Sequence, residues 1–277
     1  MNLMSAPVSP RPVGELLRDW RQRRRMSQLD LATEAEISTR HLSFLETGRA
    51  QPSREMVLHL AERLEVPLRE RNALLVAAGF APMFKERPLD DPALQAARQA
   101  LELVLRGHEP YPALAVDRHW NLVAANRSIG PFMQGIDPEL LKPPVNVLRL
   151  ALHPKALAPR IVNLLEWRAH LIARLHQQIA ASADPGLQAL LRELLDYPVP
   201  GAAGHQAPQH DYAGVVVPLQ IDAPGGVLSF FSTITVFGTP VDITLSELAL
   251  EAFFPADEAT ARALRRLGDG QAAASGA

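Results

Sequence analysis

The sequence predicts a multidomain protein: an all-α domain of five helices, followed by an α+β domain with a small antiparallel sheet. Two observations predict this arrangement. Between residues 13 and 79, apolar residues repeat at helical spacing in five short segments that are separated by capping residues. Towards the C-terminus, the runs VVVPLQI and VLSFFSTITVF are rich in β-branched and aromatic residues, which favour strands.

The bulk composition fits two domains of different character. The chain has 277 residues, a net charge of −2 and no cysteine, so it offers neither a disulfide nor a thiolate metal site. The residues up to Phe80 are slightly basic and the remainder is acidic, which fits a nucleic-acid-binding part joined to a part that does not touch nucleic acid. No apolar run approaches the roughly 18 residues that span a bilayer, and the N-terminus lacks a signal-peptide pattern. We therefore expect a cytoplasmic protein that binds no membrane.

Capping residues mark the helices of the first domain, which we place at residues 10–80. Ser27, Ser38 and Ser53 are good N-caps, and Gly48 supplies a C-terminal stop. The predicted helices span residues 13–25, 27–35, 38–47, 54–64 and 67–78. Their apolar stripes predict a core of Leu16, Leu17, Trp20, Leu29, Leu31, Ala32, Leu42, Leu45, Met56, Val57, Leu60, Ala61 and Leu64.

Three prolines and mixed charges over residues 81–92 predict a linker. A helix over residues 93–106 follows it, with apolar residues on one side. This helix joins the domains, contributes to a dimer seam or simply packs, and packing is the commoner use of such a helix.

We place the second domain at residues 93–268 and a disordered tail at 269–277. The segment PALAVDRHWNLVAAN predicts two strands around a turn at Asp117, and residues 223–226 predict a hairpin turn. The apolar segment 245–254 fits a strand or a helix. Further helices, expected on one side of the sheet, begin at Ser128 and span 145–152, 159–180, 185–195 and 257–267, with a loop over 197–212.

Residues 27–47 have the form of a helix-turn-helix, whose second helix enters the major groove of DNA. Leu42 and Leu45 are expected to point into the core, which leaves the opposite face for base edges. Arg40 can bind a guanine through two parallel hydrogen bonds, and Phe44 can contact a thymine methyl group. The residues expected to contact a double-stranded DNA operator are Gln28, Ser38, Thr39, Arg40, His41, Ser43, Phe44 and Arg49.

Several of these residues have a structural alternative. Phe44 is explained about equally well by partial burial against a neighbouring helix, and His41 by ordinary exposure to solvent. The arginines within residues 21–25 are typical of a solvated helix end. Gln28 begins a helix, where its amide can donate to a phosphate beside the helix N-terminus.

Residues 13–66 resemble the Cro/repressor-type family of helix-turn-helix proteins, also called the XRE family. The resemblance is carried by SQLDLA before the turn, by LETG at the end of the recognition helix, and by a Pro-Ser pair before the next helix. It implies that Arg21 and Glu46 form a structural ion pair. The usual glycine of the turn is Glu36 here; a left-handed backbone would be strained at this residue, so an altered turn is expected.

Most of the chain is similar to regulators with an MmyB-like ligand-binding domain. DRHWNLVAAN, VNVLRLALHP and EAFFPADEAT carry this similarity in the second domain. The resemblance implies a PAS-like sensor fold behind the DNA reader, and a fatty acid or another apolar molecule as ligand. No other cofactor is expected.

Such a sensor needs an apolar cleft with a few polar anchors, and the long helix over residues 159–180 is its best wall. An acidic ligand would need arginine or histidine at the mouth of the cleft. The residues expected to line the site are Trp120, Phe132, Arg160, Leu164, Trp167, His170, Leu171 and Arg174. Each of them also fits ordinary core or surface. Asn126 is expected to bind local backbone, and Phe230 and Phe231 must face opposite sides of one strand.

The leading hypothesis is a sequence-specific transcription regulator, a homodimer on a two-fold operator, whose second domain senses a small apolar or fatty-acid-like molecule. The alternative is a DNA-bound adaptor whose second domain binds a protein partner. The sequence contains no P-loop, GxGxxG or HExxH motif, so we expect no catalytic residue and no metal site.

Overall fold

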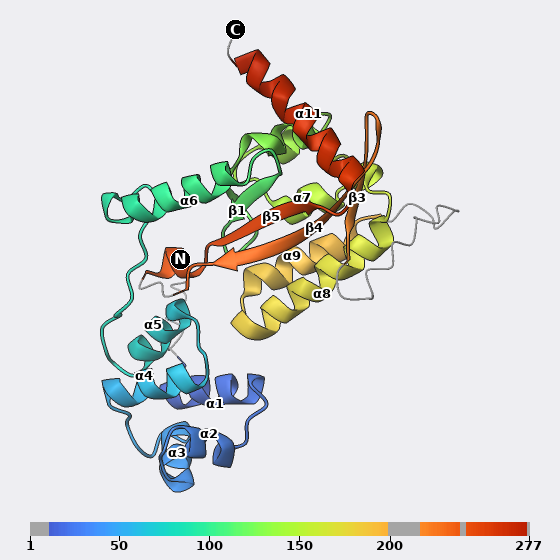
Figure 1. Cartoon of the computed structure of the whole chain (residues 1–277). Helices are drawn as coiled ribbons and strands as arrows, with labels where there is room; N and C mark the ends of the chain where they lie inside the picture. The colour runs from blue at the N-terminus through green and yellow to red at the C-terminus, as the bar shows by residue number, and fades with distance from the viewer. Residues whose placement is uncertain (1–10, 199–216, 239–241, 276–277) are drawn as a thin grey trace, which may run out of the picture. The chain divides into compact units, whose positions relative to one another are not determined.

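The computed structural model describes residues 11–198, 217–238 and 242–275 (Figure 1). Contacts divide the chain into two compact units. The first consists mainly of the residues up to Glu86, and the second holds most of the remainder. None of the described helices is long and apolar enough to cross a membrane.

The first unit contains the five predicted helices, each within about two residues of its expected ends. Ser27 caps α2 by accepting a hydrogen bond from the Asp30 amide at 3.1 Å, and the Asp30 carboxylate accepts one in return from the Ser27 amide at 2.7 Å. Ser38 and Ser53 cap α3 and α4 in the same way. The helices are α1 (Val13–Arg23), α2 (Gln28–Glu34), α3 (Thr39–Glu46), α4 (Arg54–Arg63) and α5 (Leu68–Ala77).

The predicted core of this unit is largely confirmed. Leu17, Leu31, Leu42 and Leu60 are fully buried in one cluster with the other apolar stripes. The prediction that Leu29 belongs to this core is wrong, because its side chain is 63% exposed. Its neighbours on α2 that face the core lie two and three residues further on, so the helical period turns Leu29 towards solvent.

The turn between α2 and α3 keeps its left-handed residue, so the expected alteration is wrong. Glu36 has φ of +53°, in the region that favours glycine. The Ile37 amide donates to the Ala32 carbonyl at 2.9 Å and closes the end of α2. The surrounding packing therefore holds this glutamate in an uncommon backbone conformation.

The predicted pair of Arg21 and Glu46 is present and buried. Arg21 Nε and Nη2 donate to the two oxygens of Glu46 at 2.6 and 2.9 Å, and Arg21 Nη1 donates to the Met26 carbonyl at 2.8 Å. Gly14 lies at the same helix contact, where a Cβ would come within 2.3 Å of the Leu45 carbonyl oxygen. The close approach of α1 to α3 thus requires a glycine and encloses an ion pair.

The second unit contains a five-stranded sheet in the order β2-β1-β5-β4-β3, in which every neighbouring pair is antiparallel. The expected hairpin joins β3 and β4 with Ala223 opposite Gly226. The ambiguous segment 245–254 divides into a short helix and a strand. The strands are β1 (Ala113–Val116), β2 (Leu122–Ala125), β3 (Leu219–Ala223), β4 (Gly226–Val236) and β5 (Ala249–Pro255), and the short helix is α10 (Ile243–Ser246).

The helices of this unit depart from expectation at several ends. They are η1 (Pro92–Leu94), α6 (Gln95–Gly107), η2 (Arg127–Met133), η3 (Pro138–Leu141), α7 (Val147–Leu152), η4 (Ala158–Arg160), α8 (Leu164–Ser182), α9 (Pro185–Asp196) and α11 (Glu258–Ser275). The helix expected from Ser128 is a 3₁₀ segment with Pro131 inside it. α11 runs past its expected end at Leu267, into the predicted tail. Most of the expected loop over 197–212 lies outside the described residues.

The long helix begins at Leu164 rather than at residue 159 because the chain before it pairs with β3. The Val162 amide donates to the Gln220 carbonyl at 2.9 Å, and Ile161 forms a β-bridge with Ile221. Asn163 Nδ2 donates to the Pro218 carbonyl at 2.8 Å. These extended residues bind one edge of the sheet before the helix starts.

Helices cover both faces of the sheet, which corrects the expectation of one covered side. On one face, α7, α8 and α9 pack against Leu114 and Val116 of β1 in the larger core. On the other face, Leu101 and Leu105 of α6 pack against Ala113, Ala115 and their neighbours on β5. All four residues of β1 are buried as a result.

We expect Glu46→Ala to lower the free energy of unfolding of the first unit by about 3–5 kcal/mol, because it leaves the Arg21 guanidinium buried without its partner. Amide hydrogen exchange in α1 and α3 of the full chain measures this loss. Arg11→Ala is the control, because Arg11 pairs with Asp19 with its side chain 55% exposed. Equal loss of protection in both variants would contradict the structural role of the buried pair.

Candidate DNA interface and ligand cavity

The recognition helix α3 presents the face that the sequence predicted. Leu42 and Leu45 are buried, at 0% and 1% exposed, and anchor the helix to the core. Thr39 and Arg40 are exposed, and Ser38 holds the helix start through its hydroxyl, which accepts from the His41 amide at 3.1 Å. His41, Ser43 and Phe44 are partly buried, and Arg49 is exposed beyond the helix end.

Two arginines flank the ring of Phe44. The guanidinium carbon of Arg40 lies 5.3 Å from the ring centroid, and that of Arg49 lies 5.8 Å from it. Both distances are within the range of cation–π attraction. Phe44 is partly buried, as one of the two expectations had it, and its ring also supports the two guanidinium groups.

The side chain of Gln28 is already engaged within the protein. Its Nε2 donates to Glu46 Oε2 at 2.8 Å, on the same carboxylate that binds Arg21. The side-chain amide has a second N–H, which remains the group that can donate to a phosphate. The predicted contact of Gln28 with DNA thus depends on the ion pair between α1 and α3.

The arginines at the end of α1 have a structural role. Arg24 Nε and Nη2 donate to the carbonyls of Leu64 and Glu65, both at 2.8 Å. These bonds cap the end of α4. Arg24 is therefore not the solvated helix end that was expected: it is partly buried and binds the end of α4.

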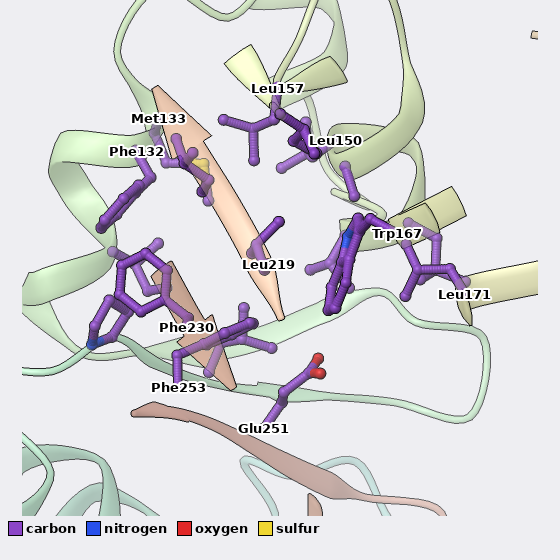
Figure 2. A pocket seen from close by; sticks show the side chains of 18 residues that line it. Phe132, Met133, Leu150, Leu157, Trp167, Leu171, Leu219, Phe230, Glu251 and Phe253 are labelled. Carbon is purple, nitrogen blue, oxygen red and sulfur yellow. The ribbon is translucent and has the colours of Figure 1, made fainter. Parts of the chain in front are cut away.

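The larger core of the second unit contains an apolar cavity of about 90 Å³ between the sheet and the helices (Figure 2). Phe230 and Phe253 reach it from the strands, and Trp167 and Leu171 reach it from α8. Phe231 faces the other side of β4 and stacks on Phe254, as alternation along a strand requires. The cavity is smaller than the several hundred cubic ångströms usual for a ligand site.

Of the eight residues predicted to line the site, Phe132, Trp167 and Leu171 line this cavity. The other five do not line it. His170 stacks on Trp167, with ring centroids 5.2 Å apart, and Leu164 is partly buried in the surrounding core. Arg160 donates to the carbonyls of Phe132 and Gln134. Trp120 and Arg174 stack on each other, with the guanidinium carbon 4.3 Å from the ring centroid.

His170 is a poor anchor for an acidic ligand. Burial lowers the pKa of its imidazole below the ordinary 6.5, and the charge of Arg174 lowers it further. The ring is therefore neutral at pH 7 and adds no positive charge near the cavity.

Glu251 is the residue that sequence reasoning missed. It lies on β5 and is the only charged side chain among the described residues that line the cavity (Figure 2). Its Oε1 accepts hydrogen bonds from Arg174 Nη1 at 3.1 Å and from Ser232 Oγ at 3.0 Å. An acidic residue within the apolar run LALEAFF was the available signal, but that run did not distinguish strand from helix.

Asn126 has the local role that was expected. Its Oδ1 accepts from the Ala113 amide at 3.1 Å, and its Nδ2 donates to the carbonyls of Leu105 and Tyr111 at 3.1 and 2.8 Å. Asn126 thus ties the end of β2 to α6 and to the start of β1. Among the described residues, no three histidine, aspartate or glutamate side chains gather into a group that could hold a metal ion.

Comparison with known protein families gives two matches. The MmyB-like transcription regulator ligand binding domain matches residues 97–267, more than half of the chain. A helix-turn-helix domain matches residues 12–74. No curated protein sequence matches the chain significantly.

Two solved structures show limited similarity. The clp gene regulator ClgR from Corynebacterium glutamicum is 28% identical, with 35% of this chain and 90% of that chain covered and a TM-score of 0.22. An RNA-binding light-oxygen-voltage receptor is 13% identical, with 95% of this chain and 63% of that chain covered and a TM-score of 0.23.

We expect Arg40→Ala to weaken operator binding by about 1–3 kcal/mol and to relax preference at one base position, because the guanidinium is exposed on the recognition face. Affinities for a set of single-base operator variants measure the effect. Arg40→Lys is the matched control, since it keeps the charge and loses the two-pronged geometry. Equal weakening on every sequence would count against a base contact.

We expect Gln28→Ala to weaken binding to all operator variants by a similar factor, because a phosphate contact carries no base information. The same set of affinities measures it. Thermal unfolding is followed in parallel, since the substitution also removes the hydrogen bond to Glu46. A changed base preference would contradict the phosphate role.

Proposed function

Since the chain belongs to the family of transcription regulators with an MmyB-like ligand-binding domain, we propose that a small apolar molecule in the cavity of its second unit changes its affinity for a DNA operator. The observation that carries this proposal is the apolar cavity within the domain that matches the ligand-binding model. The chain thus combines a DNA-binding module with a ligand-binding one.

The DNA half of the proposal rests on the geometry of the first unit. The capped recognition helix, the left-handed turn and the buried Arg21–Glu46 pair support an XRE-type reader. A homodimer would place two recognition helices in successive major grooves, about 34 Å apart. Leu103 and Val104 of α6, 67% and 58% exposed, are candidate residues for the dimer contact. A protein with this function acts in the compartment of the chromosome, which is the cytoplasm of a bacterial cell.

The sensor half rests on the second unit. The order of its strands, together with helices α7, α8 and α9 over the cavity face of the sheet, supports a PAS-like domain. The ligand would lie between the sheet and these helices. A fatty acid remains one candidate ligand of the proposal, although a long acyl chain needs more room than about 90 Å³. Met133 and the leucines of the lining would have to move to admit it.

Ligand acts on DNA binding only if its affinity differs between the DNA-competent and the DNA-incompetent state. Both matched domains are regulatory, so we propose no catalytic step. The competing proposal, an adaptor that docks a protein partner, predicts an empty cavity and a persistent protein complex.

Native mass spectrometry of the full-length protein, followed by denaturation, tests the sensor function. We expect a released apolar molecule at one per subunit and a mass that reports the homodimer. Titration of the released molecule into protein and operator should then change the apparent dissociation constant by at least fivefold. A protein that carries no small molecule, and whose operator affinity no apolar compound changes, would favour the adaptor.

We expect Trp167→Ala to reduce affinity for the apolar ligand at least tenfold, because the indole forms one wall of the cavity. Operator binding by ligand-free protein should remain within twofold of wild type. Ligand titration and operator titration on the same preparation measure both quantities. Loss of the folded second unit, seen by circular dichroism, would show instead that Trp167 is required as core.

A further inference from the structure

One carboxylate stands in an otherwise apolar cavity. Seventeen of the described side chains that line it are apolar, and the remaining one is Glu251, whose side chain is 7% exposed. Figure 2 shows the carboxyl group directed from β5 towards the Trp167 side of the cavity. Burying a carboxylate costs folding free energy unless its oxygens are paired, so a carboxylate in this wall indicates a specific role.

The two oxygens of Glu251 differ in their partners. Oε1 accepts two hydrogen bonds, one from Arg174 Nη1 and one from Ser232 Oγ. Oε2 accepts none from any described residue, and it is not fully buried. Oε2 is therefore the oxygen that reaches open space, and the cavity is the space that Glu251 lines.

Arg174 balances the charge of Glu251 without entering the cavity. Its guanidinium lies over the Trp120 ring and bonds Glu251, and its side chain is 18% exposed. Glu251 thus offers a hydrogen-bond acceptor to a ligand in the cavity, and Arg174, outside the lining, compensates its charge.

We propose that the ligand of this cavity has a compact apolar body and one neutral hydrogen-bond donor, such as an alcohol hydroxyl, that donates to Glu251 Oε2. This inference rests on the proposed sensor function and names its ligand class. An ionised carboxylate head has no proton to donate to Oε2, and none of the described residues that line the cavity is a cation that could bind it. An ammonium head would add a second cation beside Arg174 in a desolvated site.

The size of the cavity points to a small molecule. At about 90 Å³ it is smaller than the engineered cavity of about 150 Å³ that holds benzene. The flexible side chain of Met133 in its wall gives room for a few additional atoms. A five-carbon chain with one head group is therefore a suitable probe.

The test compares pentan-1-ol, pentanoate and pentylammonium, which share one chain and differ in the head group. Ligand-observed NMR titration of the full-length protein gives their dissociation constants at pH 7. We expect pentan-1-ol to bind at least tenfold more tightly than either charged probe. Pentanoate or pentylammonium binding as tightly as the alcohol would overturn the neutral-donor head group.

Glu251→Gln tests the acceptor itself. The glutamine oxygen can keep the bonds from Arg174 and Ser232, which places an N–H donor where Oε2 was. The preference for pentan-1-ol over pentanoate should then fall at least tenfold. Glu102→Gln on α6, with the glutamate 51% exposed, is the matched control and should leave the preference unchanged. An unchanged preference in a folded Glu251→Gln variant would overturn the role of Glu251.

The outcomes separate this inference from the sensor function. Failure of all three probes to bind at millimolar concentration would overturn the inference, because the cavity would then admit no such molecule. The release of a native ligand and its effect on operator affinity are measured independently. The regulator can therefore sense another compound even where the alcohol is not preferred. The comparison of probes on wild-type protein needs no variant to fold.

Discussion

Burial of the sheet on both faces is the constraint on which the second unit depends. Side chains along a strand alternate between faces, so each residue of β1 is assigned to one helical layer. Leu114 and Val116 belong to the cavity side, whereas Ala113 and Ala115 lie beneath α6. A slip of one residue would place alanines at the cavity and force larger side chains against α6. The register between β1 and its neighbours is therefore strongly specified.

This register also decides which side chains line the cavity. β5 pairs with β1 so that Leu114 lies opposite Glu251 and Ala115 lies opposite Leu250. Glu251 and Phe253 consequently point into the cavity, and Leu250 packs under α6. The polar element of the cavity is thus set by the same alternation that closes the core.

In the first unit, one carboxylate links three helices. Glu46 of α3 binds Arg21 of α1 with both oxygens and accepts a further hydrogen bond from Gln28 of α2. Each bond engages a charged group away from water, where partners are strongly interdependent. The pair positions the recognition helix, and Phe44 then orders two arginines on its exposed side. The buried ion pair and the ring of Phe44 therefore support the exposed face of α3 from opposite sides of the helix surface: one within the core, the other among the exposed arginines.

The sequence by itself determined the features that act over a few residues. Serine caps, helical periodicity and the hairpin turn predicted the five helices and the β3–β4 pair, since each signal lies within about one turn of the element that it specifies. Family resemblance added the Arg21–Glu46 pair, which the structure contains.

Only the tertiary structure decided which side chains meet. The start of α8 depends on pairing of residues 161–163 with β3, and the second covered face depends on α6. Helical spacing marked a polar stripe of His170 and Arg174 as ligand anchors, but the two side chains stack on tryptophans and neither lines the cavity. Glu251 entered the cavity because strand pairing joined segments far apart in the chain, and no local pattern records such pairing.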